Sequence, residues 1–207
     1  MRHTKAYPYA VTTPPEALPL SPADVKTQLK LDPADNSQDE YLSTLIAAAT
    51  DYAERYTRRD LLTRSYITYR DCFYDEIELR RCPVQSVRWI KYLQNGAFAT
   101  VDPASYYNTV EPDGYTRIAL YENLSWPQPV DNRLQAVQIA FTAGYGDAAA
   151  DLPQELRLAI LQHTAQLYAH RGDNDFPQGH ASDATQDAAP PAIARALYDK
   201  YRIIDIY

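Results

Sequence analysis

The sequence predicts an α+β protein in which a small bundle of about four helices carries an inserted antiparallel β domain and an extended C-terminal tail. Apolar residues recur at helical spacing towards both ends of the chain, and short runs with two-residue alternation occupy the middle. The extreme C-terminus is apolar, which is unusual for a terminus that contacts nothing. A length of 207 residues fits one domain that carries an insertion.

The first helical segments are predicted from proline and capping signals. Residues 1–20 are proline-rich and are expected to form an extended arm, because proline fixes φ and lacks a backbone donor. Ser21, Pro22 and Asp24 provide a cap, a first-turn proline and an early acid, which predicts a short helix over 22–30.

The second helix is predicted over 38–57, where apolar residues follow a helical period. Ser37 and Glu40 have the spacing of a capping box, which would start this helix. Segment 21–60 is therefore expected to supply the first part of the helical core.

The inserted β domain is predicted over 61–150. Asn95 and Gly96 form a dipeptide typical of a type I′ hairpin, since both residues tolerate positive φ. The β pattern ends near Gly144-Tyr145-Gly146. Strands are expected at 66–69, 77–80, 87–93, 98–101, 115–120 and 134–142.

The second part of the helical core is predicted over 151–201. Asp151 is expected to cap a helix that ends near Arg171, and a short last helix should run from Pro190 to about Tyr201. Between them, 172–189 lacks Leu, Ile and Val and is rich in Asp, so we expect a mobile loop. Residues 202–207 form the C-terminal tail.

Composition excludes several classes of function. The net charge of −7 opposes a sequence-tolerant grip on the phosphate backbone of DNA, which depends on Lys and Arg. No apolar run approaches the ~20 residues of a membrane helix, and the N-terminus lacks the apolar region of a secretory signal. We therefore expect synthesis in a cytoplasm, which favours Cys72 and Cys82 as two thiols; a single disulfide between them is the alternative.

No pattern in the sequence predicts a catalytic, cofactor or metal site. His163 and His170 are seven residues apart, whereas a helical zinc site uses two histidines four apart. Asp173, Asp175 and Gly179 do not have the spacing of a calcium loop. Gly144-Tyr145-Gly146 lacks the lysine of a phosphate loop. We therefore predict that the chain is not an enzyme.

Four arginines gather around the end of the second predicted helix, and arginine exceeds lysine by 15 to 5 in the whole chain. They suit the negative end of the helix dipole, which is a structural interpretation. The alternative is an interface with another subunit or an acidic partner, because arginine makes forked bonds to carboxylates and phosphates. These residues are Arg55, Arg58, Arg59 and Arg64.

An ordered set of fragments resembles the head-to-tail connector, or adaptor, proteins of long-tailed bacteriophages and gene transfer agents. The fragments are Leu18-Pro19-Leu20-Ser21-Pro22-Ala23-Asp24-Val25-Lys26, Leu45-Ile46-Ala47-Ala48-Ala49 with Ala53-Glu54-Arg55-Tyr56-Thr57, Pro83-Val84-Gln85-Ser86-Val87, and Phe141-Thr142-Ala143-Gly144-Tyr145-Gly146 with Leu152-Pro153 and Ala159-Ile160-Leu161. The resemblance extends to about Arg171, and 172–189 departs from it.

The resemblance implies a structural virion protein of the capsid-tail neck, synthesised in a bacterial host. Such a protein forms a probable twelvefold ring of identical subunits beneath the portal protein, extends the DNA channel, and offers a surface to the next neck or head-closure protein. It implies no catalytic residue and no cofactor. The negative charge fits a channel through which DNA passes without specific binding.

The apolar tail is the candidate portal-binding segment, and its residues are Tyr201, Ile203, Ile204, Ile206 and Tyr207. The alternative is that the tail packs on this chain's own β domain or helices. Two other functions stay open: another neck component, such as a head-closure or tail-completion protein, and an enzyme or carbohydrate-binding module with an aromatic-lined pocket.

Overall fold

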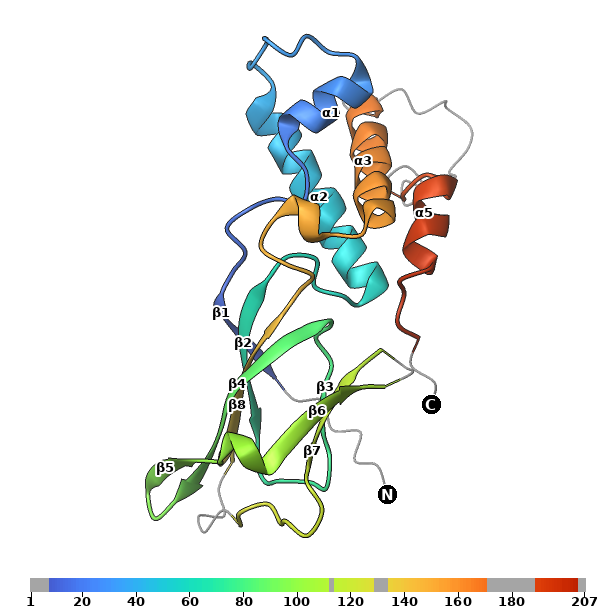
Figure 1. Ribbon diagram of the computed structural model, residues 1–207. Helices are drawn as coiled ribbons and strands as arrows, with labels where there is room; N and C mark the ends of the chain where they lie inside the picture. Colours follow the sequence, from blue (N-terminus) through green and yellow to red (C-terminus); the bar gives the residue numbers. More distant parts are fainter. Residues whose placement is uncertain (1–7, 112–113, 129–133, 171–188, 205–207) are drawn as a thin grey trace, which may run out of the picture. The chain divides into compact units, whose positions relative to one another are not determined.

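A computed structural model describes residues 8–111, 114–128, 134–170 and 189–204 (Figure 1). Its described residues form four α-helices and two open antiparallel sheets, so the predicted α+β class is confirmed. The contacts divide the chain into two units. We call Glu16–Leu62 with Gly146–Arg202 the helical unit, and Met1–Pro15, Thr63–Tyr145 and Ile203–Tyr207 the β unit.

Helix α1 (Pro22–Leu29) begins as the sequence predicts. The hydroxyl of Ser21 accepts a hydrogen bond from the Asp24 amide, and the Ser21 amide donates to the Asp24 carboxylate at 2.8 Å. The helix ends at Lys30, whose φ of 56° is left-handed.

Helix α2 (Asp39–Thr57) has nearly the predicted range, but the predicted capping box is wrong. Gln38 occupies the N-cap position and its side chain makes no capping bond, while the Ser37 amide donates to the Asp35 carboxylate at 2.9 Å. This local turn around Asp35 fixes Ser37 outside the helix. Arg58 ends the helix with a left-handed φ of 59°.

Helix α3 (Gln154–Ala169) starts differently from the prediction. Asp151 closes a short 3-10 turn, η2 (Ala149–Asp151), and its carboxylate accepts from the Ala148 amide instead of capping α3. Pro153 precedes the helix, which ends two residues before the predicted Arg171.

The last described helix is α5 (Ala192–Asp199), which ends two residues before the predicted Tyr201. The predicted mobile loop 172–189 lies almost wholly outside the described residues.

The core of the helical unit consists of buried residues at helical spacing. Helix α2 packs against α3 and α5, and α1 packs against α2 and α3. Burial of each large aliphatic side chain is worth about 1.5–3 kcal/mol before ordering costs, so this shared face holds the helices together. The buried set includes Val25, Leu42, Ile46, Ala49, Ala53, Leu156, Ala159, Ile160, Ala194 and Tyr198.

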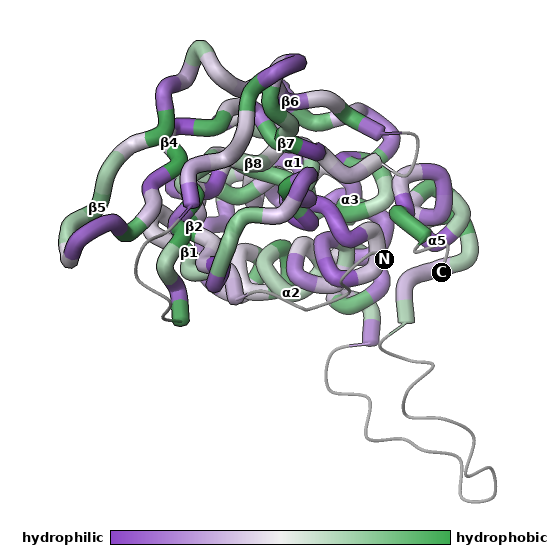
Figure 2. Tube along the Cα trace, turned by 90° about the horizontal axis from the view of Figure 1, so that it is seen from below, coloured by the Kyte–Doolittle hydropathy of each residue, from purple (hydrophilic) through white to green (hydrophobic). Residues whose placement is uncertain are grey.

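The larger sheet of the β unit has the strand order β1-β2-β8-β4-β5. Its strands are β1 (Tyr9–Thr13), β2 (Arg64–Arg70), β8 (Val137–Ala143), β4 (Val84–Gln94) and β5 (Ala97–Thr100). Both hydrophobic and hydrophilic residues occur along the strands of this unit (Figure 2), and the most deeply buried positions of β4 are Ile90 and Leu93. Asn95 and Gly96, with φ of 53° and 77°, join β4 to β5 and confirm the predicted hairpin.

The smaller sheet has the order β3-β7-β6, with β3 (Ile77–Leu79), β7 (Thr116–Leu120) and β6 (Tyr106–Val110); the short 3-10 helix η1 (Pro103–Ser105) precedes β6. Both sheets contribute to one buried core, which therefore joins them within the β unit. This core includes Tyr66, Ile90, Ile139 and Phe141 from the larger sheet and Ile77, Leu79 and Ile118 from the smaller one.

Two strands differ from the prediction. Part of the expected extended arm is β1, which pairs with β2 from Tyr9 opposite Thr68 to Thr13 opposite Ser65. Strand β6 was not predicted, because four of its five residues are exposed and show no buried alternation. Its pairing with β7, with Tyr106 opposite Leu120, determines its conformation.

Candidate interface surfaces

The four predicted arginines occupy different environments. Arg55 lies on the exposed surface of α2 and forms an ion pair of 3.7 Å with Asp51, one turn earlier. An exposed pair of this kind adds little stability, so Arg55 is available to a partner. Arg58 is exposed at the end of α2, and Arg64 is half-buried at the start of β2 in the other unit.

Arg59 has an intramolecular role. Its Nε donates a hydrogen bond of 2.7 Å to the carbonyl oxygen of Tyr201, so it holds the chain just after α5 against the end of α2. A hydrogen bond from a charged donor is worth about 1.5–3 kcal/mol where it is partly shielded from water. Arg59 therefore has a structural role in the helical unit, through a hydrogen bond that the sequence did not predict.

The segment after α5 is fixed by a second contact. The Tyr201 hydroxyl and the Lys200 ammonium both donate to the Glu155 carboxylate, at 3.1 and 2.6 Å. These two bonds hold the pKa of Glu155 below its ordinary value, and the bond from Lys200 has the larger effect. Tyr201 is thus engaged within the helical unit.

Two adjacent isoleucines of the tail differ sharply. Ile203 is only 3% exposed and packs with Cys82 and Tyr115 of the β unit, whereas Ile204 is 67% exposed. The alternative that the tail packs on this chain thus applies to Ile203. Ile206 and Tyr207 lie outside the described residues, and portal binding by the tail stays a prediction.

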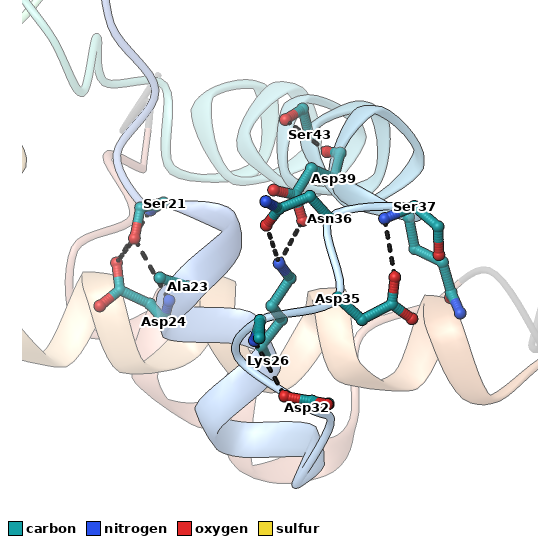
Figure 3. A network of polar contacts seen from close by, with 12 residues as sticks. Ser21, Ala23, Asp24, Lys26, Asp32, Asp35, Asn36, Ser37, Asp39 and Ser43 are labelled. Carbon is teal, nitrogen blue, oxygen red and sulfur yellow. Dashed lines mark hydrogen bonds and ion pairs between the residues drawn. The ribbon is translucent and has the colours of Figure 1, made fainter.

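The connection between α1 and α2 is organised around one lysine. Lys26 projects from α1, its side chain is 5% exposed, and its Nζ lies 2.6 Å from Oδ1 of Asp39 and 3.1 Å from Oδ1 of Asn36 (Figure 3). A lysine withdrawn from water needs such partners. Asp32 and Asp35 each accept from a backbone amide two residues later, so the whole connection has a defined shape.

One histidine and three tyrosines of the helical unit form a packed cluster. His163 is buried and meets the Tyr52 ring edge-on at 5.0 Å, while Tyr52 stacks on Tyr56 at 5.8 Å. Tyr198 packs against the same rings, and burial raises the pKa of its hydroxyl. The cluster joins α2, α3 and α5, so its function is structural.

Other sequence candidates also have structural roles. Gly144 adopts a φ of 128°, which favours glycine. Gly146 lies so close to Asp151 that a Cβ at this position would be 2.3 Å from the Asp151 side chain. Both glycines are therefore required by the tight turn of the backbone. Among the described residues, no His, Cys, Asp and Glu side chains form a group of metal-binding type. No described helix is long and apolar enough to cross a membrane.

A surface that sequence reasoning missed lies on the smaller sheet. Tyr107 and Tyr121 are exposed with their rings 5.2 Å apart, and they line an open hollow of about 670 Å³ together with Leu120 and Glu122. Part of this surface lies on β6, and the composition of that strand could have indicated it, because aromatic and β-branched residues favour strands. Its residues are Tyr106-Tyr107-Asn108-Thr109-Val110.

Comparison with known proteins defines the class to which this fold corresponds. Residues 23–91 match the family model described as "Phage gp6-like head-tail connector protein", a segment that runs from α1 through most of β4. The predicted resemblance to head-to-tail connector proteins is therefore confirmed over this segment. No curated protein matches the chain.

Solved structures with the same fold come from particles called gene transfer agents (GTA). A chain in the "Neck of empty GTA particle computed with C6 symmetry" is 23% identical, with a TM-score of 0.75 and 97% coverage of both chains. A chain in the "Virion of native gene transfer agent (GTA) particle" is 22% identical, with a TM-score of 0.72 and coverage of 96% and 97%. One in the "Neck of native GTA particle computed with C12 symmetry" is 24% identical, with a TM-score of 0.66 and 98% coverage of both.

Proposed function

We propose that this chain is a structural neck protein of a phage-like particle, which assembles as a ring of identical subunits and connects the DNA-filled head to the tail. The observation that carries the proposal is a double match. The connector family model covers 23–91, and the fold of gene transfer agent neck chains extends over nearly the whole chain, including the β unit.

The finer features of this function are twelvefold symmetry, a place beneath the portal protein, contact with the next neck or head-closure protein, and synthesis in a bacterial host. A neck structure computed with C12 symmetry contains a chain of this fold, which supports the twelvefold ring. The net charge of −7 supports a channel wall that repels rather than grips passing DNA.

Two groups of residues are proposed as contact sites in this assembly. Arg55 and Arg58 are exposed at the end of α2, where a carboxylate-bearing partner surface could reach them. In the tail, Ile204 is exposed and begins the part proposed to bind the portal, together with Ile206 and Tyr207. Three apolar side chains repeated around a ring would hold by avidity even if each copy binds weakly.

The proposed function is tested by removing the gene for this chain and imaging the resulting particles. We expect DNA-filled heads without tails, and rescue by the intact chain. A chain truncated after Ile203 should stay folded with an unchanged melting temperature and fail to rescue. Normal tailed particles without the chain would overturn the proposal, and normal rescue by the truncated chain would overturn the portal-binding role of the tail.

A catalytic role is the less favoured alternative. The described residues supply no cluster of metal-binding type, and the hollow beside Tyr107 and Tyr121 is open rather than enclosed. Another neck component would share the fold, and a neck reconstruction distinguishes it, because the proposed connector contacts the portal directly.

A further inference from the structure

In the described part of the chain, the two sheets of the β unit end in four edge strands, and these strands are not equally protected against pairing with another strand. The edges are β1 and β5 in the larger sheet and β3 and β6 in the smaller one. An open edge presents unpaired backbone N–H and C=O groups, and proteins usually block it with proline, charge, a bulge or short length. An edge without such features is a candidate interface.

Two of the four edges carry these blocking features. Strand β1 lies between Pro8 and Pro14 and has an irregular register between Val11 and Thr13. Strand β3 has three residues, with Glu78 at its centre and Arg80 directly after it. The part of β4 that extends beyond β5 is also interrupted, by two register shifts in its pairing with β8, and carries Arg88.

The other two edges lack proline, charge and a register shift. Strand β5 is Ala97–Thr100 and β6 is Tyr106–Val110; neither contains a charged residue or a proline, and the pairing of each with its inner neighbour is regular. Both expose large apolar side chains: Phe98 is 47% exposed on β5, and Tyr107 and Val110 are 42% and 67% exposed on β6.

A second copy of this chain is the partner that these two edge strands fit. A closed ring of identical subunits uses head-to-tail contacts, so each copy must offer two different surfaces that fit one another. Among the described strands, two edges lack proline, charge and a register shift; they have four and five residues and lie on two different sheets. Because neither strand is charged, their pairing avoids the repulsion expected between copies that each carry a net charge of −7.

We propose that neighbouring copies of this chain join by pairing β5 of one copy with β6 of the next, which makes a continuous sheet across each subunit boundary. Phe98 of one copy then lies against Tyr107 and Tyr121 of the other, in the hollow that these tyrosines line. Main-chain hydrogen bonds supply the register and the aromatic contact supplies buried apolar area. The inference rests on the proposed ring function and names its subunit contact.

Cysteine cross-linking inside assembled particles tests this contact. Two double variants place one thiol on each edge: Phe98→Cys with Tyr107→Cys, and Thr100→Cys with Thr109→Cys. After mild oxidation of purified particles, at least one pair should give a ladder of dimers and higher multimers on a denaturing gel. Each single variant should stay monomeric.

A matched control places the second thiol on the blocked edge: Val11→Cys with Phe98→Cys. Val11 is 53% exposed, comparable to Phe98, so this pair adds the same number of surface thiols and should give no ladder. Melting temperatures and the amount of chain in the particles establish that each variant folds and assembles.

Failure of the β5–β6 contact and failure of the proposed neck function give different results. Particles that contain both double variants and give no ladder would overturn the β5–β6 contact while leaving the neck function intact. An equal ladder from the Val11 control would also overturn it. Absence of the unmodified chain from purified particles would overturn the proposed function itself.

Discussion

Lys26 of α1 and Asp39 at the start of α2 form an ion pair with 2.6 Å between Nζ and Oδ1, and the lysine side chain is almost fully withdrawn from water. Asn36 accepts a second bond from the same ammonium group. The pair connects the first two helices at the beginning of the segment that matches the connector family.

Replacement of Asp39 by alanine should lower the free energy of unfolding by about 1–3 kcal/mol. Removal of one partner leaves the Lys26 charge buried with only Asn36 to accept from it, although the 37% exposure of Asp39 moderates the loss. Lys26→Met should cost less, because it leaves no buried cation. Urea denaturation measures both, and Arg55→Ala, which breaks an exposed pair, should change stability by less than about 0.5 kcal/mol. An equal, small effect of all three would contradict the prediction.

Lys30→Gly should raise the free energy of unfolding by up to about 1 kcal/mol. Lys30 ends α1 in a left-handed conformation that costs a residue with a Cβ about 1–2 kcal/mol and costs glycine almost nothing, although glycine loses more chain entropy on folding. Thermal melting measures the change. Ala196→Gly, within α5, is the control and should lower stability by about 1 kcal/mol. A lower melting temperature for Lys30→Gly would refute the reasoning.

Asp24→Ala should destabilise the protein at neutral pH but not in acid. Hydrogen bonds from the backbone and hydroxyl of Ser21 lower the pKa of Asp24 from its ordinary value of 3.8. A lowered pKa in the folded state means that the charged carboxylate adds stability above the ordinary value, and that this contribution is lost as the pH falls through the lowered value. The difference from the unchanged chain should be about 1 kcal/mol at pH 7 and should shrink as the pH falls below the ordinary pKa of 3.8.

Denaturation across this pH range measures the effect of Asp24. Ser21→Ala removes the hydroxyl that takes part in two of the three hydrogen bonds between Ser21 and Asp24, so the pH dependence should also weaken in that variant. A stability difference that does not vary with pH would show that the Asp24 charge contributes nothing.

Ile203→Ala should lower the free energy of unfolding by about 2–4 kcal/mol, because it opens a cavity beside Cys82 and Tyr115. Ile204→Ala is the matched control, with the same chemical change at an exposed position, and should cost less than about 0.5 kcal/mol. Thermal and urea denaturation compare the two. Equal effects would mean that the two isoleucines do not differ in burial.

The helices were predictable because their signals are local. The apolar period that places Leu42, Ile46 and Ala53 on one face of α2 is contained in the segment itself, and so is the cap at Ser21. The start of α2 was not predictable to the same degree. Ser37 and Glu40 had the right spacing, but Asp35 and Lys26, which lie outside that motif, decide where the helix begins.

The strands and interfaces depended on distant residues. Strand β1 forms because Tyr9 pairs with Thr68 far along the chain, and β6 forms against β7 although most of its own side chains are exposed. The sequence also could not distinguish Ile203 from Ile204, since only the folded β unit decides which isoleucine is covered. The site residues therefore needed the structure, whereas the class of fold did not.

The register of β2 with β8 has a consequence for the order in which the chain folds. Arg64 lies opposite Ala143, so the beginning of β2 and the end of β8 are neighbours, and the chain leaves and re-enters the helical unit at adjacent points. During synthesis, α1 and α2 emerge long before α3 and α5, so the packing between these helices cannot form until the later helices have been made. Once the β segment has folded, the entropy of closing its long loop has already been lost, and α3 emerges beside the end of α2. We therefore expect substitutions that slow the folding of the β segment to slow the packing of the helices as well.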